Sequence, residues 1–130
     1  MNPDSWRTIQ TLAATFDAAD ADKGMTREEW WALQVLKIGE EFGEAAQAVI
    51  GVRGTNPRKG TSHTWQDVHE EVADVVITGM VALARMRPDA AEFLAAQLGV
   101  KSAKFLPPTP DVPTPASAPQ DVPTRASAPR

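Results

Sequence analysis

The clearest structural signal in this chain of 130 residues lies in residues 26–51, which read TREEWWALQVLKIGEEFGEAAQAVIG. Thr26 is followed three residues later by Glu29, and this capping-box pattern predicts that a helix begins there. Apolar residues then recur at alternating spacings of four and three, which predicts one helix to about Gly51 with an apolar seam close to that of a coiled coil. The seam consists of Trp31, Val35, Ile38, Phe42, Ala45 and Val49.

The residues that follow predict a loop and then another long helix. Residues 51–63, GVRGTNPRKGTSH, contain three glycines and a proline without any periodicity, so we expect a loop there. Thr64 is followed three residues later by Asp67, which again predicts the start of a helix. One side of this helix is apolar, and the residues on that side are Val68, Val72, Val75, Gly79, Leu83 and Met86.

Two shorter helices are expected near the ends of the folded part. Asp4 or Ser5 is expected to cap a first helix, which residues 19–24 should interrupt. Pro88 suits the first turn of a last helix that ends near Gly99. No segment alternates between apolar and polar residues as a strand would. The predicted fold class is therefore all-α, a four-helix antiparallel bundle.

The C-terminal residues have a different composition from the rest of the chain. Eight of the 11 prolines lie in residues 107–130, and residues 111–120 are nearly repeated by residues 121–130. Such a segment lacks the apolar surface needed to offset its ordering entropy, so we expect a disordered tail that favours polyproline II. One folded domain is then expected in residues 1–106.

The overall composition excludes several classes of protein. The chain has no cysteine, which excludes a disulfide scaffold and thiolate chemistry. No apolar run approaches the length of a membrane span and no signal peptide is recognisable, so a cytoplasmic protein without a membrane partner is expected. The net charge of −4 argues against nucleic acid as a partner, although a metal would allow a small anionic substrate.

Each of the two long helices is expected to present a row of acidic side chains. The rows are Lys37, Glu40, Glu41 and Glu44 on the first helix, and Asp67, Glu70, Glu71 and Asp74 on the second. Solvated faces are the ordinary interpretation of such rows. However, pairs such as Glu41 and Glu44 place carboxylates about 5–6 Å apart, which is repulsive unless a cation lies among them. Hard divalent cations, Mg²⁺ in particular, prefer such oxygen ligands.

The acidic residues also match a known family pattern. Residues 40–44, EEFGE, are followed after 26 residues by residues 71–74, EVAD. This pair resembles the EExxE and ExxD helical motif of MazG-like nucleotide pyrophosphohydrolases, within the all-α NTP pyrophosphatase superfamily. The resemblance extends over about residues 30–84. It implies a hydrolase dependent on Mg²⁺, or Mn²⁺, that converts a nucleoside triphosphate to the monophosphate and pyrophosphate, and it implies a homodimer or homotetramer.

The resemblance also implies roles for individual acids. Glu41, Glu44, Glu71 and Asp74 match the metal ligands of the family. Glu40 matches a further ligand or the base that deprotonates the attacking water. Metal ions neutralise phosphate charge and orient the leaving group, while a nearby carboxylate takes the proton, so carboxylates suit both roles.

Candidate substrate-binding residues are fewer and each has an ordinary alternative. Lys37 points with the acids and either contacts phosphate or forms an ion pair with Glu40 or Glu41. Trp30 shares the face of Glu41 and Glu44, where it either stacks on a base or packs against another helix. The remaining candidates are the basic residues Arg58 and Lys59 on the predicted loop and Lys101 and Lys104 after the last helix.

Two other functions fit the same sequence. The first is a helical interaction module without catalysis, which would use the proline-rich tail to bind a partner. The second is a related pyrophosphatase that acts on a phosphoribosyl nucleotide. A di-iron site is disfavoured because no Glu has a His three residues later.

Overall fold

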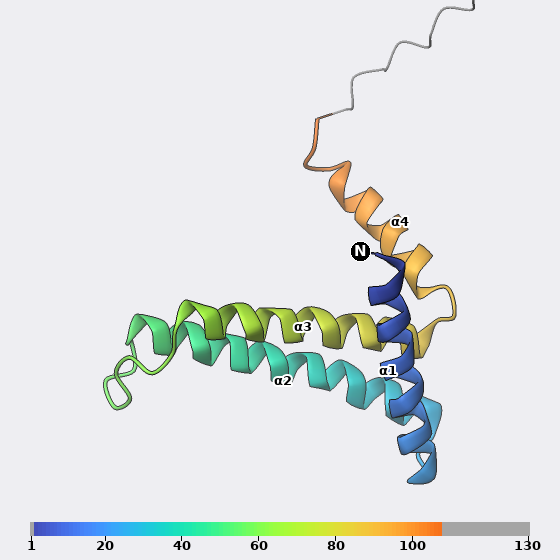
Figure 1. Cartoon of the computed structure of the whole chain (residues 1–130), viewed down its shortest axis with the longest axis horizontal. Helices are drawn as coiled ribbons and strands as arrows, with labels where there is room; N and C mark the ends of the chain where they lie inside the picture. The colour runs from blue at the N-terminus through green and yellow to red at the C-terminus, as the bar shows by residue number, and fades with distance from the viewer. Residues whose placement is uncertain (1, 108–130) are drawn as a thin grey trace, which may run out of the picture.

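The computed structural model describes residues 2–107, which contain four α-helices and no strand (Figure 1). The helices are α1 (Pro3–Asp22), α2 (Arg27–Arg53), α3 (Trp65–Met86) and α4 (Ala90–Ser102). The prediction of an all-α chain is confirmed for these residues. None of the four helices is long and apolar enough to cross a membrane. The predicted tail, except for Pro107, lies outside the described residues.

The two long helices begin where their capping boxes predict. The Thr26 amide donates to Glu29 Oε2 at 2.7 Å, and the Glu29 amide donates back to Thr26 Oγ1 at 3.3 Å. Thr64 and Asp67 make the same reciprocal pair at the start of α3, at 2.6 and 3.3 Å. Each pair satisfies amide groups that have no partner within the helix, which stabilises the helix start.

The boundaries of α1 differ from the prediction. Asn2 caps the helix, because its side-chain oxygen accepts a hydrogen bond of 2.8 Å from the Ser5 amide, so the prediction of Asp4 or Ser5 as the cap was wrong. The helix also continues through the alanine-rich residues 18–21, which favour helix, to Asp22. It ends before Gly24, whose φ of 73° only glycine adopts easily.

The last helix also begins and ends later than predicted. Asp89 occupies the N-cap position of α4, so Pro88 precedes the helix and does not lie in its first turn. Arg87, the residue before this proline, is extended at φ −142° and ψ 133°, because a residue before proline avoids the helical region, and α3 ends there. The helix passes Gly99 and ends at Ser102.

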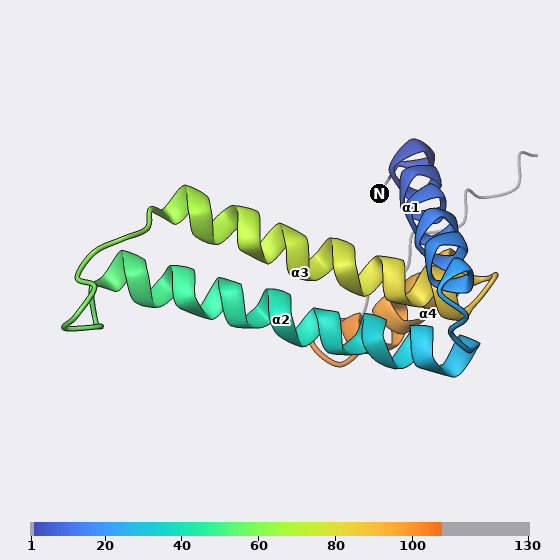
Figure 2. The same ribbon diagram turned by 90° about the horizontal axis from the view of Figure 1, so that it is seen from below.

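The α2–α3 hairpin is the central feature of the fold. The two helices lie side by side in opposite directions, and the loop that joins them lies at one end of the hairpin (Figures 1 and 2). At the other end α1 crosses α3, and α4 also contacts α3 before it leads away (Figure 1). Among the described residues, antiparallel packing along whole helices therefore occurs between α2 and α3.

The buried apolar cluster lies where α1 crosses α3. It consists of Ile9 and Ala13 from α1 and of Met80 and Val81 from α3. These four side chains fix α1 across the C-terminal half of α3. The crossing places α1 over one end of the hairpin, where residues of α1, α2 and α3 together line a pocket.

The apolar seam predicted on α2 is not the buried face of α2 within one chain. Phe42 is 67% exposed and Val35 is 50% exposed, whereas Ala45 alone of the six seam residues is buried. The buried residues of α2 are instead Gln34, Glu41, Ala45, Ala48 and Gly51. Small residues let α3 approach closely along this line, and the two polar side chains find partners there.

Candidate metal centre and adjoining pocket

Three carboxylates meet between α2 and α3. Glu41 and Glu44 extend from α2 and Glu71 extends from α3, and one oxygen from each lies within 4.8 Å of the others. Glu41 is buried, Glu71 is partly buried and Glu44 is exposed. The spacing of three residues places the two acids of α2 on neighbouring turns, opposite Glu71. The structure thus brings together three of the four acids that match the metal ligands of the family pattern.

The carboxylates repel one another where they meet. The pKa of Glu44 is raised above its ordinary value by desolvation and by the negative charges of Glu41 and Glu71. Lys37 offsets part of this charge, because its ammonium group lies 2.9 Å from Glu41 and 3.1 Å from Glu40. These two carboxylates, Glu41 first, raise the pKa of Lys37. The cluster is therefore a group of like charges that could hold a metal ion.

The two other acids of the predicted site lie beside the cluster. Asp74 is exposed and is not among the three grouped carboxylates. It lies four residues before Thr78, so it shares the face of α3 that carries Thr78. Glu40 is exposed on α2 and forms its ion pair with Lys37. Both acids are within one helical turn of a cluster residue in sequence, and neither belongs to the grouped oxygens.

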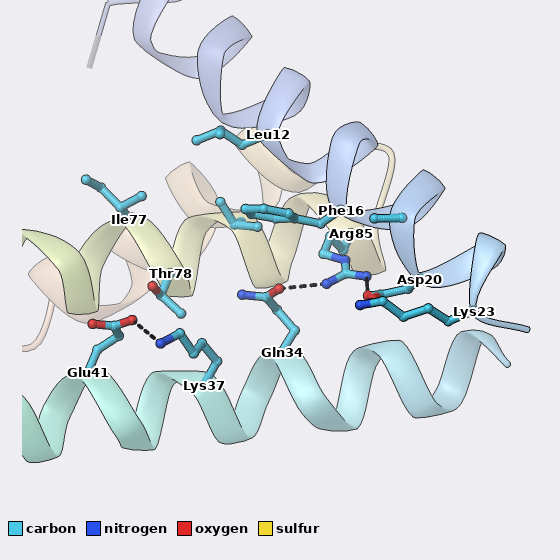
Figure 3. A pocket seen from close by; sticks show the side chains of 12 residues that line it. Leu12, Phe16, Asp20, Lys23, Gln34, Lys37, Glu41, Ile77, Thr78 and Arg85 are labelled. Carbon is cyan, nitrogen blue, oxygen red and sulfur yellow. Dashed lines mark hydrogen bonds and ion pairs between the residues drawn. The ribbon is translucent and has the colours of Figure 1, made fainter. Parts of the chain in front are cut away.

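A pocket adjoins the carboxylates and continues toward the crossing of α1 (Figure 3). Its volume is ≈ 580 Å³. Three helices line it, with Leu12, Phe16, Ala19 and Asp20 from α1, Gln34, Lys37 and Glu41 from α2, and Ile77, Thr78, Val81 and Arg85 from α3, together with Lys23. Glu41 thus belongs both to the carboxylate cluster and to the pocket wall.

The end of the pocket away from the carboxylates, its inner end, contains the buried side chain of Arg85, which the sequence analysis missed. The Arg85 side chain is only 4% exposed. Its guanidinium donates to Asp17 Oδ1 at 2.8 Å, to Gln34 Oε1 at 2.7 Å and to Asp20 Oδ2 at 2.5 Å. The hydrogen bond from Arg85 also lowers the pKa of Asp20. This network joins α1, α2 and α3 at one point.

Little in the sequence points to this network. Its partners are separated from Arg85 by 51 to 68 residues, so no local spacing relates them. The one available signal is that Arg85 lies near the end of an acidic helix that has no Lys or Arg from position 67 to position 84. The acids at positions 17 and 20, spaced to share a face of α1, complete that signal.

The two adjacent tryptophans of α2 lie beside Arg85. The Arg85 guanidinium lies 5.9 Å from the centre of a Trp30 ring, and the Trp31 indole donates a 3.1 Å hydrogen bond to the Arg85 carbonyl. Trp30 does not line the pocket, and its indole nitrogen is buried without a hydrogen-bond partner among the described residues. Contact of Trp30 with a base remains a prediction.

The basic residues predicted to bind phosphate lie away from the carboxylates. Arg58 and Lys59 are exposed on the loop at the far end of the hairpin (Figure 1). Lys101 and Lys104 are exposed at the end of α4. None of these four residues lines the pocket beside Glu41, whereas Lys37 does. The single chain therefore brings one of the five candidate cations to the site.

Comparison of the chain with family models, curated proteins and solved structures gives no match. The functional interpretation therefore depends on the residues of the site.

Proposed function

We propose that the chain is a metal-dependent nucleoside triphosphate pyrophosphohydrolase of the MazG-like type, and that its substrate is a nucleoside or deoxynucleoside triphosphate. The observation that carries the proposal is the meeting of Glu41, Glu44 and Glu71 beside a pocket that Glu41 lines. A pocket of ≈ 580 Å³ is within the range of small-molecule sites, and a nucleotide is such a ligand.

The donor set fits a hard divalent cation. Three carboxylate oxygens within 4.8 Å of one another supply negative charge and no nitrogen or sulfur, which favours Mg²⁺ or Mn²⁺. The raised pKa of Glu44 indicates that these charges lack full compensation. Glu41, Glu44 and Glu71 would hold the cation, and we propose Asp74 as a fourth ligand because it lies three residues from Glu71 on α3.

In the proposed reaction, water attacks the phosphorus of the α-phosphate and pyrophosphate leaves. When bound, the divalent cation neutralises phosphate charge and orients the leaving group. Glu40 lies next to the cluster in sequence and is exposed, so we assign it the proton of the attacking water. Lys37 contacts Glu40 and Glu41 directly and can balance charge as the proton moves.

Pyrophosphate release tests this proposal. Purified protein with Mg²⁺ or Mn²⁺ should release pyrophosphate, and not orthophosphate, from at least one member of a panel of NTPs and dNTPs. Glu71→Gln should abolish the release, whereas Glu70→Gln, at the preceding position of the same helix but outside the cluster, should retain it. A phosphoribosyl nucleotide in the panel tests the related pyrophosphatase. Failure with every substrate, without any effect of metal on thermal stability, would favour the interaction module.

We further propose that a second copy of the chain covers an exposed apolar groove on the hairpin. The groove has a volume of ≈ 530 Å³ and is lined only by apolar side chains, namely Phe42, Ala45, Ala46, Val49 and Ile50 from α2 and Val72, Val75 and Val76 from α3. A contiguous exposed apolar surface of this kind is typical of a protein interface. A paired hairpin would supply the remaining helices of an antiparallel bundle and produce the expected homodimer, on which a homotetramer could build.

A further inference from the structure

Gln34 is a buried residue, and only its side-chain oxygen has a hydrogen-bond partner among residues 2–107. Gln34 is 8% exposed and lines the pocket. Its Oε1 accepts the 2.7 Å hydrogen bond from Arg85. Its Nε2 has no hydrogen-bond partner among residues 2–107, and Figure 3 shows this nitrogen directed away from Arg85. Nε2 is not fully buried, and a ligand oxygen in the pocket that accepts from it would gain a hydrogen bond with a donor that no protein group occupies.

Arg85 determines which amide atom faces the pocket. A guanidinium has donors and no acceptor, so the Gln34 atom that contacts it must be the oxygen. The two acids Asp17 and Asp20 hold the guanidinium in place from α1. As a result the amide cannot reverse without losing its contact with Arg85. Gln34 therefore presents a fixed NH₂ donor to the pocket.

The surroundings of this donor suit a flat heterocycle. Phe16 and Leu12 extend from α1 on one side of the pocket, and Gln34 extends from α2 on the other (Figure 3). Phe16 is 42% exposed and lines the pocket, so its aromatic side chain is accessible to a ligand ring. Ile77 and Val81 add apolar surface from α3. An aromatic and aliphatic wall with one fixed polar group is the usual construction of a site that orients a ring.

We infer that the inner end of the pocket binds a nucleobase through a carbonyl oxygen, and that the Gln34 Nε2 group is the donor that selects it. This inference rests on the proposed function, because it places the phosphates at the carboxylate end. Gln34 and Glu41 are seven residues apart on α2, which is about 10 Å along the helix. A nucleotide that spans this separation points its base inward.

The orientation specifies which bases are selected. With the sugar toward Glu41, the inner edge of a pyrimidine carries the substituent at C4, and that of a purine carries the substituent at C6. A fixed donor matches the carbonyl of uracil, thymine, hypoxanthine or guanine. It opposes the amino group of cytosine or adenine, because two donors would face each other. A site that hydrogen-bonds its substrate rejects an analogue that leaves its polar group unpaired.

Binding of deoxynucleoside monophosphates to the full chain tests the inference without hydrolysis. In buffer with Mg²⁺, calorimetry should show that dUMP binds about tenfold or more tightly than dCMP. Gln34→Met should bring the ratio close to one, because methionine fills the space without a donor. Gln34→Glu should reverse the ratio, because one carboxylate oxygen can pair with Arg85 while the other accepts from cytosine. Gln47→Glu, an exposed position on the same helix, should leave the ratio unchanged.

Equal binding of dUMP and dCMP by the wild-type protein, or an unchanged ratio in a folded Gln34→Met variant, would overturn the inference. Should the variants not fold, the ligands decide alone: dUMP must bind more tightly than its 4-thio analogue, a poorer acceptor, and dIMP more tightly than dAMP. Hydrolysis of dUTP and dCTP with equal kcat/KM would contradict the proposed base subsite and support the proposed hydrolase activity. Tighter binding of dUMP without hydrolysis of any nucleotide would support the base subsite and contradict the proposed hydrolase activity.

Discussion

The guanidinium of Arg85 donates a 2.7 Å hydrogen bond to the side-chain oxygen of Gln34 and so joins the end of α3 to the early turns of α2. The same group binds Asp17 and Asp20 of α1. One buried side chain therefore holds the three helices that line the pocket. A charge buried at this depth is tolerated because each of the three guanidinium nitrogens donates a hydrogen bond.

The Arg85 network is expected to be a main contributor to stability. Arg85→Met should lower the free energy of unfolding by about 3 kcal/mol, because it leaves Asp17 and Asp20 without their partner. Urea unfolding at pH 7 measures this change. Arg53→Met is the matched control, since Arg53 is exposed in the last turn of α2 and should change stability little. Equal effects of the two variants would show that the network contributes nothing specific.

Stability should also depend on pH through Asp20. Because Arg85 lowers the pKa of Asp20 in the folded state below its ordinary value of 3.8, the stabilisation is present above pH 3.8. It is lost as the pH falls through the folded-state pKa. Thermal unfolding between pH 2 and pH 6, at constant ionic strength, should therefore show a steeper acid decline for the wild type than for Arg85→Met. Parallel profiles would contradict this assignment.

Glu44 is expected to lower the stability of the protein as the pH rises, which is the opposite of the effect of Asp20. Its pKa is raised from the ordinary value of 4.5, so the folded state loses stability as the pH rises from 4.5 through the folded-state pKa. Without divalent cations, Glu44→Gln should raise the melting temperature at pH 7 above that of the wild type. The difference should vanish below about pH 4, where the carboxyl is protonated. Glu70→Gln, whose side chain is outside the cluster, should show no such gain.

With divalent cations present, the wild type should have a higher melting temperature than Glu44→Gln. Mg²⁺ should raise the melting temperature of the wild type, because a ligand bound only by the folded state stabilises it. Glu71→Gln should weaken Mg²⁺ binding at least tenfold, as loss of a direct ligand exceeds the usual effect of a supporting residue. Asp74→Asn tests the proposed fourth ligand in the same titration. An unchanged response would exclude Asp74 from the site, and an unchanged response of Glu71→Gln would exclude the metal centre.

The apolar groove should control the assembly state. Light scattering should give a mass at least twice the 14.0 kDa of one chain. Phe42→Asp should convert this species to the monomer, because Phe42 is 67% exposed in the single chain and would place a charge in the interface. Val100→Asp on α4, 55% exposed but outside the groove, is the control. A wild-type monomer, or assembly that survives Phe42→Asp, would contradict the proposed interface.

Local sequence signals predicted the helices well. Thr26 with Glu29 and Thr64 with Asp67 act within four residues, so their hydrogen bonds do not depend on the rest of the fold. The acids Glu41, Glu44 and Glu71 were also recognisable, because helical spacing places each row on one face. The cap at Asn2 was missed because several capping residues follow one another at the start of the chain, and local preference does not choose among them.

The direction in which each helix face points depended on contacts between distant residues. The spacing of apolar residues marked a seam on α2, but packing turned small residues, Gln34 and Glu41 toward α3 and left Phe42 outside. Arg85 contacts Gln34, Asp17 and Asp20, which lie 51 to 68 residues away in the sequence. The spacing of residues along one helix cannot predict such pairings. The formation of the helices and the acidic rows on α2 and α3 follow from interactions between near neighbours in the chain. The pocket and the fixed amide donor of Gln34 follow from how three helices cross. Only that crossing brings Arg85, the two aspartates of α1 and Gln34 together.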